Sequence, residues 1–268
     1  FGMPRMGIAG AAVATVIGQI IAAILALVFN LKCNRELNIS MKGFRPNGYL
    51  IVQIYKVGAP SIVVQAIGSL MTYGMNLILA AFGSAQTVFG IYFKLQSFVF
   101  MPVFGLNNGM VPIIAYNYGA GHKDRVIKTI KHSVAYGVGI MFVGLLAMHI
   151  FPAQLMRMFD AEESLIAIGA PALETISLSF VFAGFCIVAG SVFQALGNGV
   201  YSMIVSVARQ MCVLLPVAKL LSLSGEVTLI WWAFPIAELA SVLLTSYFLV
   251  RIYRKVICHI GEPVVQDA

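Results

Sequence analysis

The chain has 268 residues, of which 60% are hydrophobic and only 10% are charged, against roughly 45–50% and about 25% in an ordinary soluble domain. Together with a mean hydropathy of +0.93, this composition argues against a soluble enzyme, a nucleic-acid-binding protein and a secreted disulfide-bonded domain, because a soluble fold could not bury so much apolar surface. The formal net charge of +7 is better explained by loop charges that orient membrane helices, so we expect no nucleic-acid partner.

Seven apolar segments are long enough to cross the ~30 Å hydrocarbon core of a bilayer. In chain order they are residues 8–31, 60–82, 85–105, 126–151, 172–196, 200–221 and 227–250. The sequence therefore predicts an all-α polytopic protein with about seven transmembrane helices, surrounded by membrane lipid. Because the chain begins with Phe1 and no charged region precedes the first apolar segment, we expect it to be a piece of a longer protein.

Two segments depart from a regular span. Residues 105–112 carry two glycines, two asparagines and a proline, which predicts a broken helix of the kind tolerated only beside protein or a water-filled cavity. Residues 39–58 mix basic and apolar side chains before Pro60, which is expected to open the next span. This stretch is either an amphipathic linker at the membrane interface or a solvated loop.

The positive charges of the connections predict an orientation. If successive connections alternate between the two sides of the membrane, twelve Lys and Arg residues gather on one side and three on the other. Cytoplasmic loops carry such an excess, so residues 32–56, the loop 117–125 and the C-terminus are expected in the cytoplasm. The acidic loop at residues 160–163 is then external, and we expect a multi-pass protein of the plasma membrane.

Four ionisable residues lie inside the predicted spans: Lys94, Glu174, Arg209 and Glu238. A charge in mid-bilayer costs at least ~2.5 kcal/mol unless it is paired or hydrated. Arg209 and Glu238 fall at nearly the same depth on consecutive antiparallel helices, counting about 1.5 Å per residue, so we predict a structural ion pair. Lys94 has no obvious partner, and we expect it to face a wet central cavity.

Uncharged polar residues supply further candidates for the lining of that cavity. Gln65, Thr72 and Asn76 follow one another at spacings of seven and four, which places them on one helix face. The next span adds Gln96, Asn107 and Asn108. Each amide or hydroxyl alone could equally bond across helices, but a polar stripe indicates a cavity more strongly than any single member.

Motifs of soluble enzymes are absent from the sequence, including the nucleophile elbow, the phosphate-binding loop and the zinc-protease motif. The four cysteines lack metal-ligand spacing and the four histidines lie far apart, so no metal site is expected. We expect neither enzymatic activity nor a cofactor.

Several stretches resemble the multidrug and toxic compound extrusion (MATE) family. The most specific is FVFMPVFGL at residues 98–106, followed by PIIAYNYGAG at 112–121, which is similar to the end of the family's eighth helix and its cytoplasmic loop. The motif residues there are Pro112, Tyr116, Asn117, Tyr118, Gly119 and Arg125. Residues 4–15 resemble the start of the sixth helix, 58–61 the opening of the seventh, and 193–198 the end of the tenth.

This resemblance implies a six-helix C-terminal lobe preceded by the last helix of a missing N-terminal lobe. The implied division is residues 1–31 for that last helix, 32–58 for a cytoplasmic inter-lobe linker, 59–258 for the C-terminal lobe and 259–268 for a cytoplasmic tail. Members of the family export cationic or amphipathic organic compounds by antiport with Na⁺ or H⁺, rocking two lobes about a central cavity. The implied partners are a small organic substrate and the missing lobe.

The sequence departs from the family at its cation sites. One branch binds the coupling cation through acidic residues in the seventh and tenth helices, but residues 61–82 and 176–196 contain no carboxylate. Gly68 and the neighbourhood of Ala183 stand where those acids are expected. Another branch uses an aspartate of the first helix, which lies outside this chain, and Asn76 occupies the pseudo-symmetric position. Coupling is therefore expected to rely mainly on the absent lobe.

Two alternatives to an exporter remain. A flippase for lipid-linked saccharides would favour a basic cavity that holds a pyrophosphate, whereas only one or two cations lie well inside the predicted spans. A non-transporting membrane scaffold would need neither a polar stripe nor a broken helix. The sequence favours the exporter, although a positive charge at Lys94 would disfavour a purely cationic substrate.

Overall fold

The computed structural model describes residues 7–33 and 45–261, and every regular element in these ranges is a helix. Six helices are long and apolar enough to cross a membrane, or seven if one bent pair is counted as a single span. The described residues therefore confirm the predicted all-α, multi-pass fold with about seven transmembrane helices.

The chain divides into two compact units, Phe1–Ile51 and Val52–Ala268. In the first unit, α1 (Gly7–Cys33) is a single helix whose described side chains are exposed along almost its whole length. Its 27 residues extend about 40 Å, enough to cross the bilayer core. Residues 34–44 of the predicted linker lie outside the described part of the chain.

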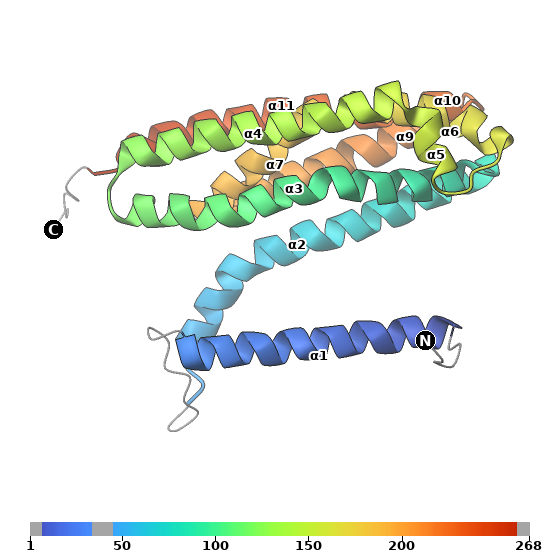
Figure 1. Ribbon diagram of the computed structural model, residues 1–268. Coiled ribbons are helices and arrows are strands. Elements are labelled where there is room, and N and C mark those ends of the chain that lie inside the picture. Colours follow the sequence, from blue (N-terminus) through green and yellow to red (C-terminus); the bar gives the residue numbers. More distant parts are fainter. Residues whose placement is uncertain (1–6, 34–44, 262–268) are drawn as a thin grey trace. The chain divides into compact units, whose positions relative to one another are not determined.

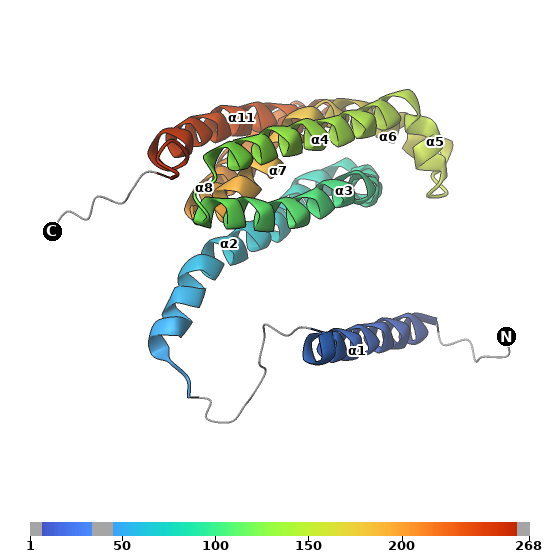
Figure 2. The same ribbon diagram turned by 60° about the vertical axis from the view of Figure 1, so that its left-hand side comes forward.

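The second unit is a bundle of antiparallel helices, coloured from cyan to red in Figures 1 and 2. After α2 (Gly48–Leu79), which starts in the first unit, and the short η1 (Ala80–Phe82), the long elements are α3 (Ala85–Gly119) and α4 (Lys123–Ile150). The remaining elements are α5 (Pro152–Arg157), α6 (Glu163–Ser177), α7 (Phe180–Ala195), α8 (Gly199–Val207), η2 (Ala208–Leu214), α9 (Leu215–Ser222), α10 (Val227–Ile230), α11 (Ala233–Ile252) and η3 (Tyr253–Ile257). One uninterrupted span consists of α8, η2 and α9, and α11 continues into η3.

The second span begins earlier than predicted. Helix α2 starts at Gly48, and Pro60 lies inside it rather than at its start. An internal proline removes one backbone hydrogen bond, but the apolar sequence continues on both sides of Pro60 and keeps the chain helical. Residues 48–58, expected to belong to a linker, are therefore helical.

The helix break predicted at residues 105–112 is wrong. Helix α3 runs from Ala85 to Gly119 and contains both Pro102 and Pro112. Hydrocarbon offers no hydrogen-bond partner to a freed backbone group, so a membrane helix tends to continue through Gly, Asn and Pro.

A bend of 49° separates α6 from α7 instead. At this bend the Ser177 hydroxyl donates to the Glu174 carbonyl (2.9 Å) and the Ser179 hydroxyl donates to the Ile176 carbonyl (2.7 Å). These side chains thus donate hydrogen bonds to carbonyls that lose their backbone partners where the helix is interrupted. The span predicted at residues 172–196 consequently starts earlier, at Glu163, and is bent.

Helices α4 and α7 approach each other closely at two buried glycines. A Cβ atom on Gly184 would lie 3.0 Å from the Gly137 carbonyl oxygen, and one on Gly137 would lie 2.7 Å from a methyl group of Val188. Small residues allow such backbone contact between membrane helices. This contact holds α4 against α7 in the bundle.

Basic side chains gather at one end of the second unit. At one end the Lys123 ammonium donates to the Cys258 carbonyl at 2.8 Å, so the loop between α3 and α4 lies against the last turn of the described chain. The start of α4 and the end of α11 and η3 lie here and carry a group of basic residues, namely Arg125, Lys128, Arg251, Arg254 and Lys255. The loop between α5 and α6, with Asp160 and Glu162, lies at the opposite end (Figure 1).

We predict that Gly137→Val lowers the yield of folded protein, because the new side chain would overlap Val188 and overpacking costs roughly 1–3 kcal/mol. Fluorescence-detected size-exclusion chromatography of the full-length protein in detergent measures this yield. Gly139→Val is the matched control, since a Cβ at Gly139 meets no atom within 4 Å. Equal yields for the two variants would contradict the proposed contact.

Candidate functional site

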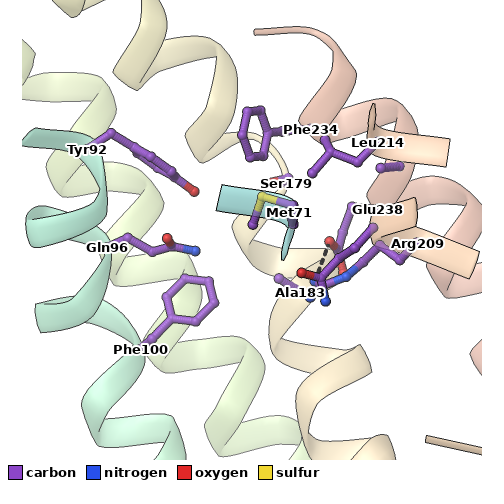
Figure 3. Close-up of a pocket in the computed structure, with 12 residues that line it drawn as sticks. Met71, Tyr92, Gln96, Phe100, Ser179, Ala183, Arg209, Leu214, Phe234 and Glu238 are labelled. Carbon is purple, nitrogen blue, oxygen red and sulfur yellow. Dashed lines mark hydrogen bonds and ion pairs between the residues drawn. The ribbon is translucent and has the colours of Figure 1, made fainter. Parts of the chain in front are cut away.

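A small cavity lies inside the second unit, where α2, α3, the α6–α7 bend, α7, η2 and α11 meet (Figure 3). Its volume of about 60 Å³ can hold a few water molecules, since one water needs about 10–15 Å³ of such space. Aromatic, amide and charged side chains line it: Met71, Tyr92, Gln96, Phe100, Ser179, Ala183, Arg209, Gln210, Leu214, Phe234, Ala237 and Glu238.

The charged residues that line the cavity form an ion pair that joins η2 to α11. The Arg209 Nη1 atom donates to Glu238 Oε2 at 3.0 Å, so the pair expected from the sequence forms. The Glu238 side chain is 6% exposed and that of Arg209 is 28% exposed. The second carboxylate oxygen, Oε1, is buried and has no hydrogen-bond partner among the described residues. Glu238 can therefore accept a further hydrogen bond, a proton or a cation.

Arg209 is presented by a π-helical segment, η2, in the middle of the span Gly199–Ser222. Pro216 lies two residues beyond the last residue of this segment, in the first turn of α9. A proline cannot donate to the carbonyl four residues earlier and its ring crowds that carbonyl, which favours a locally wider helix. π-Helical segments are frequent at functional sites, and this one turns Arg209 toward Glu238.

Aromatic rings form the apolar wall of the cavity. Tyr92 and Phe234 meet edge to face with centroids 5.8 Å apart, and Phe100 packs against Phe180 in the same manner at 5.4 Å. Pockets for whole drug-sized molecules have volumes of roughly 300–1,000 Å³, far more than this cavity offers. The described cavity suits water, an ion or one functional group of a larger ligand.

The structure brings only part of the predicted cavity lining into this cavity. Gln96 lines it. The Thr72 hydroxyl donates to the Gly68 carbonyl (2.9 Å) and the Asn76 amide donates to the Thr72 carbonyl (2.9 Å). Both side chains therefore form hydrogen bonds with the backbone of their own helix, α2. Gln65 is exposed. A place for these side chains in a cavity shared with another lobe remains a prediction.

Lys94 and the two asparagines of α3 also lie outside the described cavity. Lys94 is exposed, and its ammonium lies 5.7 Å from the ring centroid of Phe159, in the turn before α6. Such a contact stabilises a cation without an acidic partner. Asn107 is buried with an unpartnered Oδ1, whereas Asn108 is exposed.

The residues of the predicted loop motif lie at the end of α3 and the start of α4, away from the cavity. The Asn117 amide donates to the Ile113 carbonyl (2.8 Å), and the Asn117 carbonyl accepts the His122 N–H (2.9 Å). Pro112 lies inside α3. The other members are exposed: Tyr116, Tyr118, Gly119 and Arg125. Gly121 has φ +74°, a conformation that glycine adopts most readily, so this motif forms the turn between the two helices.

Tyr92, Ser179 and Gln210 line the cavity but were not predicted from the sequence. Tyr92 and Ser179 are hidden in apolar runs, but Gln210 follows Arg209 directly inside a span, and two adjacent polar residues there are a usable signal. Among the described residues, no group of three or more His, Cys, Asp or Glu side chains is arranged to hold a metal ion.

One family model and several curated proteins match the chain. The MatE family model matches residues 60–220. The multidrug export protein MepA of Staphylococcus aureus strain N315 is 26% identical over 87% of this chain and 51% of its own length. MepA of Staphylococcus haemolyticus is 25% identical over 95% of this chain and 56% of its own. The chain therefore spans about half the length of the curated relatives it matches.

Solved structures share the same fold. The MATE multidrug transporter DinF-BH, solved in complex with a ligand, is 33% identical with a TM-score of 0.81, and the match covers 94% of this chain and 57% of that one. A MOP superfamily transporter from Pyrococcus furiosus is 19% identical with a TM-score of 0.84, covering 96% and 58%. At that identity the likeness shows the fold alone.

We predict that Arg209→Gln and Glu238→Gln each destabilise the full-length protein, because either change leaves a buried charge without its partner, at a cost of roughly 3–5 kcal/mol for a fully buried pair. The partial exposure of Arg209 places the loss at the lower end of that range or below. The double variant should recover part of the melting temperature lost by the single variants, measured in detergent. Simple additivity of the two losses would rule out the interaction.

Proposed function

Because the chain belongs to the MatE family, we propose that the protein carrying it is a secondary active transporter that exports organic, drug-like and often cationic compounds. The observation that carries this proposal is the family match over residues 60–220, which includes most of the cavity and Arg209. The MepA relatives are named multidrug export proteins, and DinF-BH is named a multidrug transporter. Both support export rather than an enzymatic reaction.

The chain would supply the C-terminal lobe and the last helix of the N-terminal lobe. Transporters built from two repeated lobes bind substrate near the membrane midplane, where the lobes meet. Gln65, Lys94 and Asn108 are exposed in the described structure, as side chains that complete a cavity with a second lobe would be. The substrate would bind between the lobes, with the Arg209–Glu238 cavity behind it.

Antiport with Na⁺ or H⁺ would drive export. Residues 61–82 and 176–196 contain no carboxylate that could bind a cation, so the main coupling site is expected in the other lobe. Glu238 is the described carboxylate that reaches the cavity of this lobe, beside Ala183. This arrangement leaves room for a secondary role of the C-terminal lobe in coupling.

We place residues 32–56, the loop 117–125 and the C-terminus in the cytoplasm of a cell whose plasma membrane holds the protein. The gathering of basic residues at the end of the second unit where Lys123 meets Cys258 supports this orientation, because cytoplasmic ends of membrane proteins carry an excess of Lys and Arg.

The cavity does not favour a flippase for lipid-linked saccharides. Arg209 is the single cation among its described lining residues, and its charge is neutralised by Glu238. A pyrophosphate would need unpaired cationic donors. Nothing in the described residues favours a non-transporting scaffold.

We predict that cells expressing the full-length protein extrude ethidium, a fluorescent organic cation, against its gradient, because the proposed antiport converts an ion gradient into export. Dye efflux from preloaded cells of a pump-deficient strain is the measurement. A protonophore or a sodium ionophore, added separately, identifies the coupling ion by abolishing efflux. Cells expressing the Gly137→Val variant provide a comparison for misfolded protein, and failure to export ethidium or any of several other organic cations would contradict the proposal.

We predict that Gln96→Ala changes the rate of ethidium efflux, because Gln96 supplies an amide to the cavity. Ser97→Ala is the matched control, since the Ser97 hydroxyl is exposed and donates to the Phe93 carbonyl at 2.8 Å. Both variants should reach the membrane in normal amounts, measured by immunoblot. If the two variants export equally well, Gln96 has no part in transport.

A further inference from the structure

An open groove runs along the surface of the second unit between α3 and α4, toward the turn that joins them. Its volume of about 480 Å³ falls within the range of roughly 300–1,000 Å³ that small-molecule sites occupy. Both helices are long and apolar enough to cross the membrane, and they lie side by side in Figures 1 and 2. The groove shares no lining residue with the Arg209–Glu238 cavity and is separate from it.

The α3 side of the groove is apolar, and two of its members are glycines. Gly105 and Gly109 are four residues apart, so they lie on one face of α3, beside Leu106, Met110 and Ile113. A Cβ atom on either glycine would meet no atom within 4 Å. Unlike the glycines that hold α4 against α7, these two leave a space that no described side chain fills.

The α4 side of the groove is polar and basic. Lys128 and His132 line it one turn apart, and Arg125 precedes Lys128 by three residues, on the same face of the helix. All three are exposed. His132 Nδ1 lies 2.7 Å from the Lys128 carbonyl oxygen, which leaves Nε2 for another partner. No described residue that lines the groove is acidic, and Lys128 belongs to neither of the ion pairs found among the described residues.

The positive charge is concentrated at one end of the groove. Lys128 lies five residues after the first residue of α4, whereas Tyr136, at the other end of the groove, lies eight residues further along the helix. Eight residues extend about 12 Å, close to the ~15 Å of hydrocarbon in one leaflet, which is half of the ~30 Å core. The groove is therefore positive toward the end of the spans and uncharged toward the middle of the bilayer.

We propose that this groove binds an anionic phospholipid, with one acyl chain over Gly105 and Gly109 and the phosphate beside Lys128 and His132. Such a lipid has the same order of chemistry as the groove, because its apolar chains lie in the hydrocarbon and its negative phosphate lies at the membrane surface. Lys128 would donate a charge-assisted hydrogen bond to a phosphate oxygen, and basic pockets between membrane helices bind headgroups of this kind. A free phosphate would leave the apolar floor of the groove uncovered, and a zwitterionic lipid would bring a positive group to the basic end.

Native mass spectrometry of the full-length protein in detergent tests the basic end of the groove. Phosphatidylglycerol, added at increasing concentration, should bind in preference to phosphatidylcholine. Lys128→Gln should weaken the binding of phosphatidylglycerol about fivefold, the effect of one basic residue near a membrane surface. Lys131→Gln is the matched control, because Lys131 is exposed on the same helix but does not line the groove. If the two variants bind phosphatidylglycerol equally, or if the parent protein does not prefer it, the site is overturned.

Gly109→Leu tests the place of the acyl chain in the same measurement. The new side chain would enter the open groove and should lower the binding of phosphatidylglycerol; Gly105→Leu makes the same test if Gly109→Leu folds poorly. Gly90→Leu is the control, because Gly90 is exposed on α3 outside the groove and a Cβ there also meets no atom within 4 Å. Glycerol phosphate, a headgroup without chains, should not displace the lipid. Displacement by glycerol phosphate, or unchanged lipid binding in the groove variants, would contradict a bound acyl chain.

Photo-cross-linking identifies what occupies the groove in the full-length protein. The photoreactive residue p-benzoylphenylalanine would replace Ile113, which lines the groove and is 50% exposed. In an equal mixture of phosphatidylglycerol and phosphatidylcholine, the adduct should carry the mass of phosphatidylglycerol. A cross-link to another segment of the protein, or equal labelling by the two lipids, would overturn the proposal. None of these measurements involves transport, so their failure would leave the proposed function standing, and a lack of ethidium efflux would leave the lipid site standing.

Discussion

A polar group inside hydrocarbon finds no water to bond with, and this constraint governs the described structure from its backbone to its cavity. It explains why α3 continues as a helix through Pro102 and Pro112. It also explains why the sharp bend between α6 and α7 carries serine hydroxyls that bond to nearby carbonyls. Thr72 and Asn76 obey the same rule by bonding to carbonyls one turn earlier in α2.

Among the described residues this rule is incompletely met at Glu238, Ser241 and Thr245 of α11, and also at Asn107, Asn117 and Trp231. The Oε2 atom of Glu238 is paired with Arg209, while its Oε1 atom and the hydroxyls of Ser241 and Thr245 are buried without a partner among the described residues. The π-helical segment η2 lies at the same place. At the cavity, the π-helical segment thus coincides with a carboxylate oxygen that lacks a partner among the described residues, as expected where binding requires groups that are free to change partners.

The sequence was sufficient to predict features that depend on depth in the membrane. It was insufficient for features that depend on contacts between helices. Arg209 and Glu238 lie at equal depth on neighbouring antiparallel helices, so a count of residues was enough to pair them. Lys94 showed no partner because its contact is the ring of Phe159, which no count of charges reveals. The break expected from the glycines, asparagines and prolines of residues 105–112 did not occur, because these residues permit a break only where neighbouring groups can satisfy the freed backbone.

The sequence by itself determined that this is an all-α membrane protein with about seven spans, because hydropathy accumulates residue by residue and needs no knowledge of contacts. The resemblance to the MATE family came from short motifs, above all at residues 98–121. The sequence also determined which charges must be paired inside the bilayer. Only the tertiary structure decided that Tyr92, Ser179 and Glu238, far apart in the chain, line one cavity. It also decided that Ser241 and Thr245 face the Cys186 thiol rather than their own backbone. These contacts depend on how each helix is rotated about its own axis and on which helices lie beside it. Packing across the whole lobe fixes the rotation and the neighbours together.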